Sequence, residues 1–173
     1  MTKGELRDRY LRYLGEATIN GSPKVNKDLA DQFNYILPGA LKNVAAAFPV
    51  YAVAAATDSF TPPEDFWTLE SLTDADGMAV DYRVSPAGTY IFDGRADVKY
   101  RVLPQISSTA PDDTAVMVYP PAADLVAIQC AMTAAISFAE QSYKVAYLSS
   151  LYNTMAAQLT ISDHPRYERV YAI

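Results

Sequence analysis

The sequence is short of the residues that most catalytic and metal sites need. Among 173 residues there is one cysteine, Cys130, and one histidine, His164. A single cysteine excludes an internal disulfide and a thiolate metal cage, and a single histidine excludes a multi-histidine metal site. The glycines stand apart from one another, so no glycine-rich phosphate loop is present. We therefore expect no enzyme, no bound metal and no cofactor.

Long hydrophobic runs are also missing. Prolines and charged residues interrupt the longest apolar stretch, at Pro38, Lys42, Pro49 and Asp58. No stretch therefore approaches the roughly 18 uncharged residues that a membrane helix needs. The first residues alternate in charge and lack the apolar block of a secretory signal. Together with the single cysteine, these features predict a soluble protein made in a reducing cell, with no membrane partner.

Positive charge is scarce and unevenly distributed. The 14 lysines and arginines are outnumbered by 20 acids, for a net charge of −6. Residues 1–27 hold six basic and three acidic side chains, a local +3, so the remainder carries −9. Between Asp58 and Asp97, nine acids accompany two arginines, a local −7. Because affinity for phosphate groups comes from clustered Lys and Arg, the chain is expected to be a poor general binder of nucleic acid.

Apolar residues recur at helical spacing in four segments. The spacing predicts helices over about residues 3–17, 27–48, 122–140 and 144–159. Thr2 and Glu5 fit a capping box at the start of the first. In the second, the apolar stripe stays in phase through Pro38, which predicts one long helix, kinked there because the ring removes a hydrogen bond. The residues expected to be buried are Leu29, Phe33, Leu37, Leu41, Leu125, Ile128, Met132 and Leu148.

Between the second and third of these helices, apolar and polar residues alternate. The alternating runs are Trp67–Glu70, Met78–Val84 and Val98–Val102, with flanking strands expected at 50–57 and 115–119. Turn sequences separate the runs at residues 73–77, 85–88 and 93–94. One apolar and one polar face is typical of antiparallel strands with a single side buried. The sequence therefore predicts a small antiparallel β-meander.

The order of helices, strands and helices predicts an α+β fold. Residues 1–49 and 120–160 would form a helical core, residues 50–119 an inserted β subdomain, and residues 161–173 an extended C-terminal segment. That last segment has no helical or strand phase, yet a free tail would normally be poor in aromatics. We therefore expect it to bury its side chains against something outside the chain's own core. The partner-interface candidates are Arg166, Tyr167, Arg169, Tyr171 and Ile173.

Three features could carry chemistry, and each has a simpler interpretation. Cys130 lies mid-helix among apolar residues, where an inert buried thiol is expected. His164 follows Asp163, which could orient its ring, but a loop histidine without a catalytic role is favoured. Residues 74–77 begin like a calcium loop but lack its later ligands, so a tight hairpin turn is favoured. The 13 tyrosines fit an interface or the margin of an ordinary core equally well.

Two segments resemble motifs of the head–tail connector (adaptor) proteins of tailed bacteriophages. Phe60–Leu69 is similar to an aromatic–x–Pro–x–Asp–Phe element that precedes a strand where the family's small β insertion begins. Val98–Ile106 is similar to the strand of the form x-Tyr-x-x-x-Pro that follows the family's hairpin. Asp112–Thr114 then leads to a long helix and a second, tyrosine-containing one, as in the family. The resemblance is one of order and spacing over most of residues 27–160.

The resemblance implies a structural virion protein with no enzymatic activity. It implies a homo-oligomeric ring of about twelve copies beneath the portal protein, joined to tail or further neck proteins. Genomic DNA would pass through the lumen without sequence-specific contact, which an acidic surface suits. The implied location is the neck of the virion, after assembly in the cytoplasm of the bacterial host. The alternative from the residues themselves is a small ligand- or partner-binding domain, monomeric or dimeric and without catalysis, whose meander forms a pocket mouth.

Overall fold

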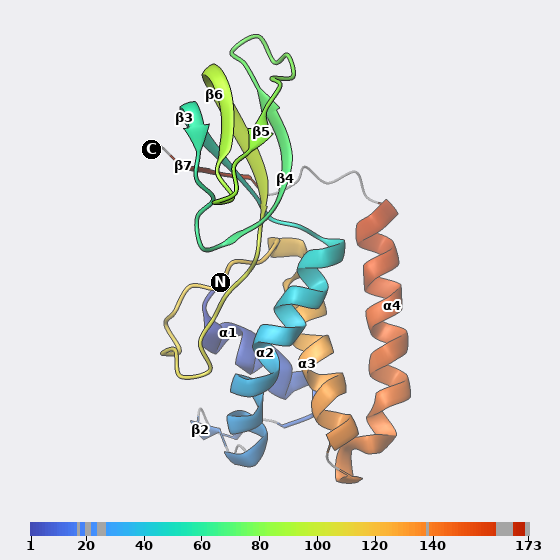
Figure 1. Cartoon of the computed structure of the whole chain (residues 1–173). Helices are drawn as coiled ribbons and strands as arrows, with labels where there is room; N and C mark the ends of the chain where they lie inside the picture. Colours follow the sequence, from blue (N-terminus) through green and yellow to red (C-terminus); the bar gives the residue numbers. More distant parts are fainter. Residues whose placement is uncertain (17, 20–21, 24–26, 138, 162–167, 172–173) are drawn as a thin grey trace. The chain divides into compact units, whose positions relative to one another are not determined.

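The computed structural model describes residues 1–173 except 17, 20–21, 24–26, 138, 162–167 and 172–173 (Figure 1). The chain divides into two compact units. Unit 1 consists of Met1–Phe48 and Pro104–Pro165, and unit 2 of Pro49–Leu103 and Arg166–Ile173. The fold is α+β, as the sequence predicts, with a largely antiparallel sheet inserted between the second and third α-helices.

Unit 1 contains the four predicted helices. They are α1 (Lys3–Tyr13), α2 (Lys27–Ala47), α3 (Ala123–Ser137) and α4 (Val145–Ile161), with short 3-10 helices η1 (Pro120–Ala122) and η2 (Ala139–Lys144) and a small pair of strands, β1 (Thr18–Ile19) and β2 (Ser22–Pro23). The capping box of α1 is confirmed, because the Glu5 amide donates to the Thr2 hydroxyl and the Thr2 amide donates to the Glu5 carboxylate. This pair satisfies two of the donors that the first turn leaves free.

Helix α2 runs through Pro38 without interruption, as its apolar phase predicts. Leu37 and Leu41 are both buried, so the residues before and after the proline keep one buried face. The kink at Pro38 stays a prediction. Of the eight residues expected to be buried, seven are, and the eighth, Met132, is half-buried against the same core.

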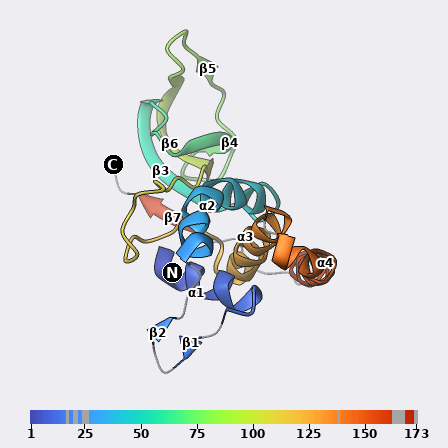
Figure 2. The same cartoon turned by 90° about the horizontal axis from the view of Figure 1, so that it is seen from below.

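Helix α3 lies at the centre of unit 1 and packs against α1, α2 and α4 (Figure 2). Small side chains make this close packing possible, because Ala127, Ala131, Ala134 and Ala135 are all buried. The largest aromatic contact of the core joins α1 to α2. Tyr10 and Phe33 have ring centroids 5.2 Å apart, and the Tyr10 hydroxyl donates to the Leu29 carbonyl at 3.0 Å.

Residues 104–119 belong to unit 1, not to the β insertion that the sequence predicts. The strand expected at 115–119 is also wrong, because only an isolated bridge forms there, between Thr2 and Ala115. The physical reason is that the backbone of this segment accepts hydrogen bonds from the first residues of α1 instead of pairing with a strand. The amides of Lys3 and Gly4 donate to the carbonyls of Thr114 (2.9 Å) and Asp112 (2.8 Å). Its alternating apolar residues pack on the helical core instead of forming a sheet.

Lys3 is buried at the first turn of α1, with 2% of its surface exposed. Its Nζ donates to the carbonyls of Ser108 (3.1 Å) and Ala110 (2.6 Å). These two hydrogen bonds join the loop of residues 104–119 to the first turn of the helix. Replacing Lys3 with alanine is expected to lower the free energy of unfolding by about 1–3 kcal/mol, because two part-buried carbonyls lose a charged donor. Urea denaturation measures the effect, with Lys27→Ala at the exposed start of α2 as the control. Equal effects of the two changes would contradict the assigned role of Lys3.

Unit 2 is built around one sheet. Its strands are β3 (Tyr51–Phe60), β4 (Phe66–Thr73), β5 (Arg83–Val84), β6 (Tyr90–Val102) and β7 (Glu168–Tyr171). They follow the order β4-β6-β3-β7, and β5 also pairs with β6. Strands β3, β4 and β5 are antiparallel to β6 (Figure 1). The antiparallel insertion is therefore confirmed, but the meander order is wrong, because β6 lies between β3 and β4, which follow each other in the sequence. Strand β7 joins from the C-terminal segment and runs parallel to β3.

Two of the three predicted turns are confirmed and one is wrong. The Asp74 carboxylate accepts from the amides of Asp76 (3.0 Å) and Met78 (2.8 Å), and the Gly88 amide donates to the Ser85 carbonyl at 2.9 Å. The sequence Asp93-Gly94 lies inside β6 and forms a bulge opposite Asp58. Gly94 has φ of 79° and Asp58 has φ of 61°, and the Gly94 amide donates to the Asp58 carboxylate at 2.9 Å. Two residues with positive φ thus bend the β3–β6 pair where a chain reversal was expected.

Candidate interaction surfaces

The described part of the chain holds no assembly of side chains suited to bind a metal. No group of three or more His, Cys, Asp or Glu side chains there could hold a metal ion. Residues 74–77 form a turn, closed by the Asp74 carboxylate. No helix in the described ranges is long and apolar enough to cross a membrane. Cys130 is fully buried and burial raises the pKa of its thiol, as expected for an inert core residue. His164 lies outside the described residues. The features that point to function are therefore surfaces.

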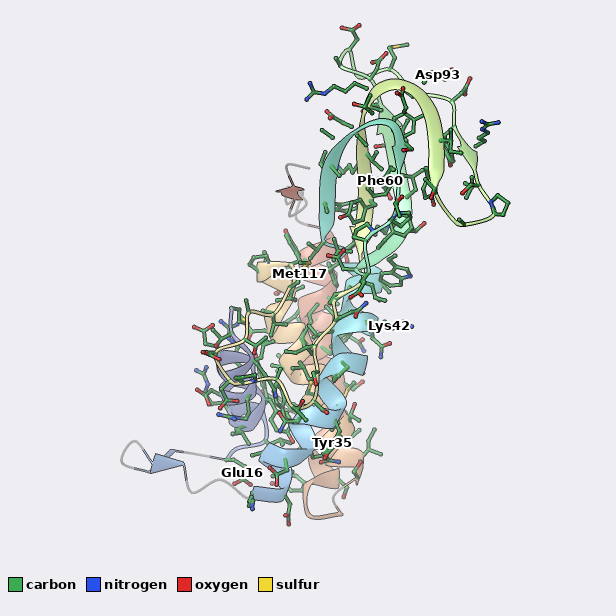
Figure 3. All side chains as sticks on the ribbon, turned by 60° about the vertical axis from the view of Figure 1, so that its left-hand side comes forward. Glu16, Tyr35, Lys42, Phe60, Asp93 and Met117 are labelled. Carbon is green, nitrogen blue, oxygen red and sulfur yellow. The ribbon has the colours of Figure 1, made fainter. Side chains whose placement is uncertain are left out.

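The two segments that resemble the adaptor motifs meet in one aromatic cluster of the sheet. Phe60 ends β3 and Phe66 begins β4, and their ring centroids lie 6.2 Å apart. Tyr100 of β6 lies 5.6 Å from Phe60 and 5.4 Å from Phe66. The backbone joins the same segments, because the Leu103 amide donates to the Asp65 carbonyl at 2.7 Å. The sequence motifs contain these residues, but the sequence did not indicate that their rings lie together around Phe60, which Figure 3 labels.

A second surface is the acidic segment that follows β4 and includes β5, residues 74–84, which we call the arm (Figure 1). Its alternating apolar residues predict a half-buried strand, but only Arg83 and Val84 form one. Met78, Tyr82 and Val84 are exposed over 66%, 48% and 54% of their surface. The reason is that β6 offers β5 only two register partners, Ile91 and Tyr90. The arm thus keeps an apolar face that the chain itself leaves largely uncovered.

Unit 1 exposes a set of large apolar side chains at one end of its helices. That end holds the first half of α2, the end of α3 and the start of α4, and Figure 3 shows Tyr35 there. The exposed residues are Tyr35, Ile136, Tyr143 and Tyr147, each with more than 60% of its surface accessible. Other tyrosines are core residues, since Tyr10 and Tyr51 are fully buried. The tyrosines therefore divide into buried core residues and exposed residues, and an interface role of the exposed ones stays a prediction.

Helix α4 carries no charged residue along its 17 positions. It packs on α3 through a half-buried apolar side that includes Leu151 and Met155. Its exposed positions hold Tyr147 near the start and otherwise small or uncharged polar side chains, namely Ala146, Ser150, Asn153, Thr154, Ala157, Gln158 and Thr160. A solvated helix face normally carries charges, whereas the cores of protein interfaces are depleted of them. The outer face of α4 is typical of a helix that a partner covers.

A groove of about 400 Å³ lies on the surface of α1 and α3. We call it the α1–α3 groove, and its lining residues are Arg9, Arg12, Tyr13 and Asp124. Arg9 forms an ion pair with Asp124 at 3.0 Å, and burial, followed by the Asp124 carboxylate, raises the pKa of Tyr13. Arg12 is exposed, and its Nε lies 3.4 Å from the Asp8 carbonyl. The groove therefore offers one guanidinium that faces solvent without a carboxylate partner among the described residues.

The C-terminal segment contains a strand, although the sequence showed no strand phase there. Strand β7 pairs with β3 from Glu168 opposite Tyr51 to Tyr171 opposite Ala54. Pairing of this kind needs only backbone groups and an open sheet edge, which β3 supplies, so alternation of side chains is not required. Two of the five interface candidates, Arg169 and Tyr171, thus lie in β7. The other three, Arg166, Tyr167 and Ile173, lie outside the described residues.

Comparison with known proteins identifies no family for the chain. No protein-family model matches it, and the search of curated proteins finds no relative.

Proposed function

We propose that the protein is a structural subunit of a ring-shaped head-to-tail adaptor of a tailed bacteriophage. The ring would lie beneath the portal, join the capsid to the tail or to further neck proteins, and let genomic DNA pass. The observation that carries the proposal is the aromatic cluster of Phe60, Phe66 and Tyr100, in which the two motif segments meet. Residues that resemble family motifs in the sequence thereby have a common structural role, the closure of the β insertion.

The exposed surfaces support a subunit with several neighbours. The arm, the large apolar side chains at the end of unit 1 and the outer face of α4, which Tyr147 joins to that end, are surfaces rich in apolar or uncharged side chains. Burial of apolar surface is favourable, and contiguous exposed apolar patches commonly mark interaction sites. A subunit in a ring meets two copies of itself, a portal above and another protein below. A small monomeric ligand-binding domain would need one concave pocket and no such set of surfaces.

The charge distribution supports passage of DNA without specific binding. Most acids of unit 2 are exposed, including Asp58, Asp76, Asp81, Asp93 and Asp97. Negative side chains repel the phosphates of a duplex, so a ring that presents them would not retain DNA. On this proposal the protein is located in the neck of the virion and is assembled in the host cytoplasm.

Mass measurement with and without the portal tests the proposal. We expect the purified chain to bind its cognate portal as a ring of about twelve copies, and to sediment with portal-bearing heads. Shells that lack the portal are the control and should bind none. A chain that stays monomeric and fails to bind the portal would contradict the proposal and favour the small partner-binding domain.

A further inference from the structure

The apolar face of the arm is exposed to solvent, and its burial against another surface would be favourable. Met78, Tyr82 and Val84 lie within seven residues and are largely exposed. Of these, Tyr82 has an aromatic neighbour in its own chain, Tyr90, with ring centroids 5.4 Å apart. The rest of the arm is acidic, since residues 74–84 hold three aspartates and one arginine, a local charge of −2. A surface that fits the arm must therefore combine apolar or aromatic area with positive charge.

The α1–α3 groove has this combination. Arg9 and Arg12 against Asp124 give it a local charge of +1, and it lies in the segment of the chain that carries net positive charge. The half-buried Tyr13 ring and the planar guanidinium of Arg12 are suited to stack against an aromatic ring such as that of Tyr82. Arginine and tyrosine are also the residues that most often anchor protein interfaces.

We propose that the arm of one copy docks in the α1–α3 groove of a second copy. Charge favours a second copy as the partner, because the arm is acidic in an acidic unit and three of the four groove residues, Arg9, Arg12 and Tyr13, lie in the basic segment of the same sequence. The two surfaces differ, so the contact is heterologous and repeats head to tail from copy to copy. Such a contact generates a closed ring when the rotation between copies permits it. The inference rests on the proposed function, to which it adds the contact between subunits.

Two pairs of variants test the contact in the full chain. Met78→Glu with Val84→Glu places charges on the apolar face of the arm, and Ala79→Glu with Ala87→Glu, both exposed, places the same charges beside that face. Arg12→Glu reverses the charge of the groove. Its control is Lys42→Glu, an exposed lysine of α2. Sedimentation equilibrium, with and without the portal, is expected to show self-association weakened about tenfold or more by the arm and groove changes, and far less by the controls.

Mixing the two defective variants gives the sharpest result. The arm variant keeps an intact groove and the groove variant keeps an intact arm, so a mixture should form a heterodimer although neither variant assembles alone. A mixture that stays monomeric overturns the proposal. Assembly of the groove variant by itself overturns it in favour of an arm–arm contact.

A cross-link detects the contact even where association is weak. A copy with Val84→Cys and a copy with Arg12→Cys are joined by a short bifunctional maleimide, and the buried Cys130 contributes little background. The product should exceed that of a Lys42→Cys control, alone or on the portal, and its absence in both settings overturns the proposal. Self-association through these residues without portal binding would leave this inference intact and refute the proposed function. Portal binding without the cross-link would refute this inference and leave the proposed function intact.

Discussion

Replacement of Phe33 by alanine is expected to lower the free energy of unfolding of the helical unit by about 3–5 kcal/mol. Phe33 is fully buried on α2, and its ring packs against that of Tyr10. The change removes buried apolar surface and leaves a cavity that the neighbouring helices cannot fill. It also removes the ring that holds Tyr10 in place to donate to the Leu29 carbonyl.

Tyr35 supplies a matched control two positions away on the same helix. It is 77% exposed, so Tyr35→Ala is expected to change the free energy of unfolding by about 0.5 kcal/mol or less. Urea denaturation followed by circular dichroism compares the two variants. A loss below about 1 kcal/mol for Phe33→Ala would show that the apolar stripe of α2 does not form the core of unit 1.

The helical unit was largely predictable because its signals are local. The period of apolar residues identified α2 through Pro38, and Thr2 with Glu5 identified the start of α1. A helix forms its backbone hydrogen bonds within one segment, so such a segment carries the pattern of its own structure. The loop 104–119 was predicted less well. Its alternating Val116 and Val118 resemble a strand, but they pack on the helical core, while the backbone there bonds to the chain's first residues.

The sheet was predictable in kind and less so in detail, because a strand depends on its partner. Residues 78–84 have strand alternation, yet β6 provides partners only for Arg83 and Val84. Asp93-Gly94 has the composition of a hairpin turn. In the sheet, however, the Gly94 amide donates to the Asp58 carboxylate on β3, and the two residues form part of a bulge. Neither outcome is visible in a window of neighbouring residues, because each depends on a residue far away in the sequence.

The candidate surfaces also include features that a short stretch of sequence reveals and features that depend on residues far away in the sequence. The adaptor-like motifs could be named from the sequence, since they are short and contiguous. The convergence of Phe60, Phe66 and Tyr100 needed the register of three strands. The apolar face of the arm was seen in the sequence but interpreted as buried, because periodicity shows which residues share a face and not what covers that face.

Deletion of residues 163–173 is expected to abolish attachment to portal-bearing heads and to weaken the sheet only in part. The deletion removes β7, which pairs with β3 over four register positions. The loss of this pairing is expected to lower the free energy of unfolding by about 1–3 kcal/mol, the value of a few backbone hydrogen bonds. The sheet should otherwise persist, because the longer β3–β6 and β4–β6 pairs remain.

The contribution of the C-terminal side chains can be separated from that of the strand. One variant replaces the interface candidates Arg166, Tyr167, Arg169, Tyr171 and Ile173 with alanine and leaves the backbone able to pair. The other, Val170→Pro, removes an amide in the middle of β7 and keeps those side chains. Hydrogen exchange of Tyr51–Ala54 on β3 reports the pairing, and sedimentation with heads reports attachment.

We expect each variant to be defective in one of the two assays and close to normal in the other. The alanine variant should keep the protection of the β3 amides and lose attachment, because Tyr and Arg side chains supply most of the binding energy of an interface. Val170→Pro should lose the protection of those β3 amides that face β7, while the amides that face β6 stay protected, and should keep most of the attachment. If the arginines pair with acids on the receiving surface, attachment should also weaken as salt is raised. Normal attachment of the alanine variant would refute the docking role of these five residues and leave the C-terminal segment as a strand of its own sheet.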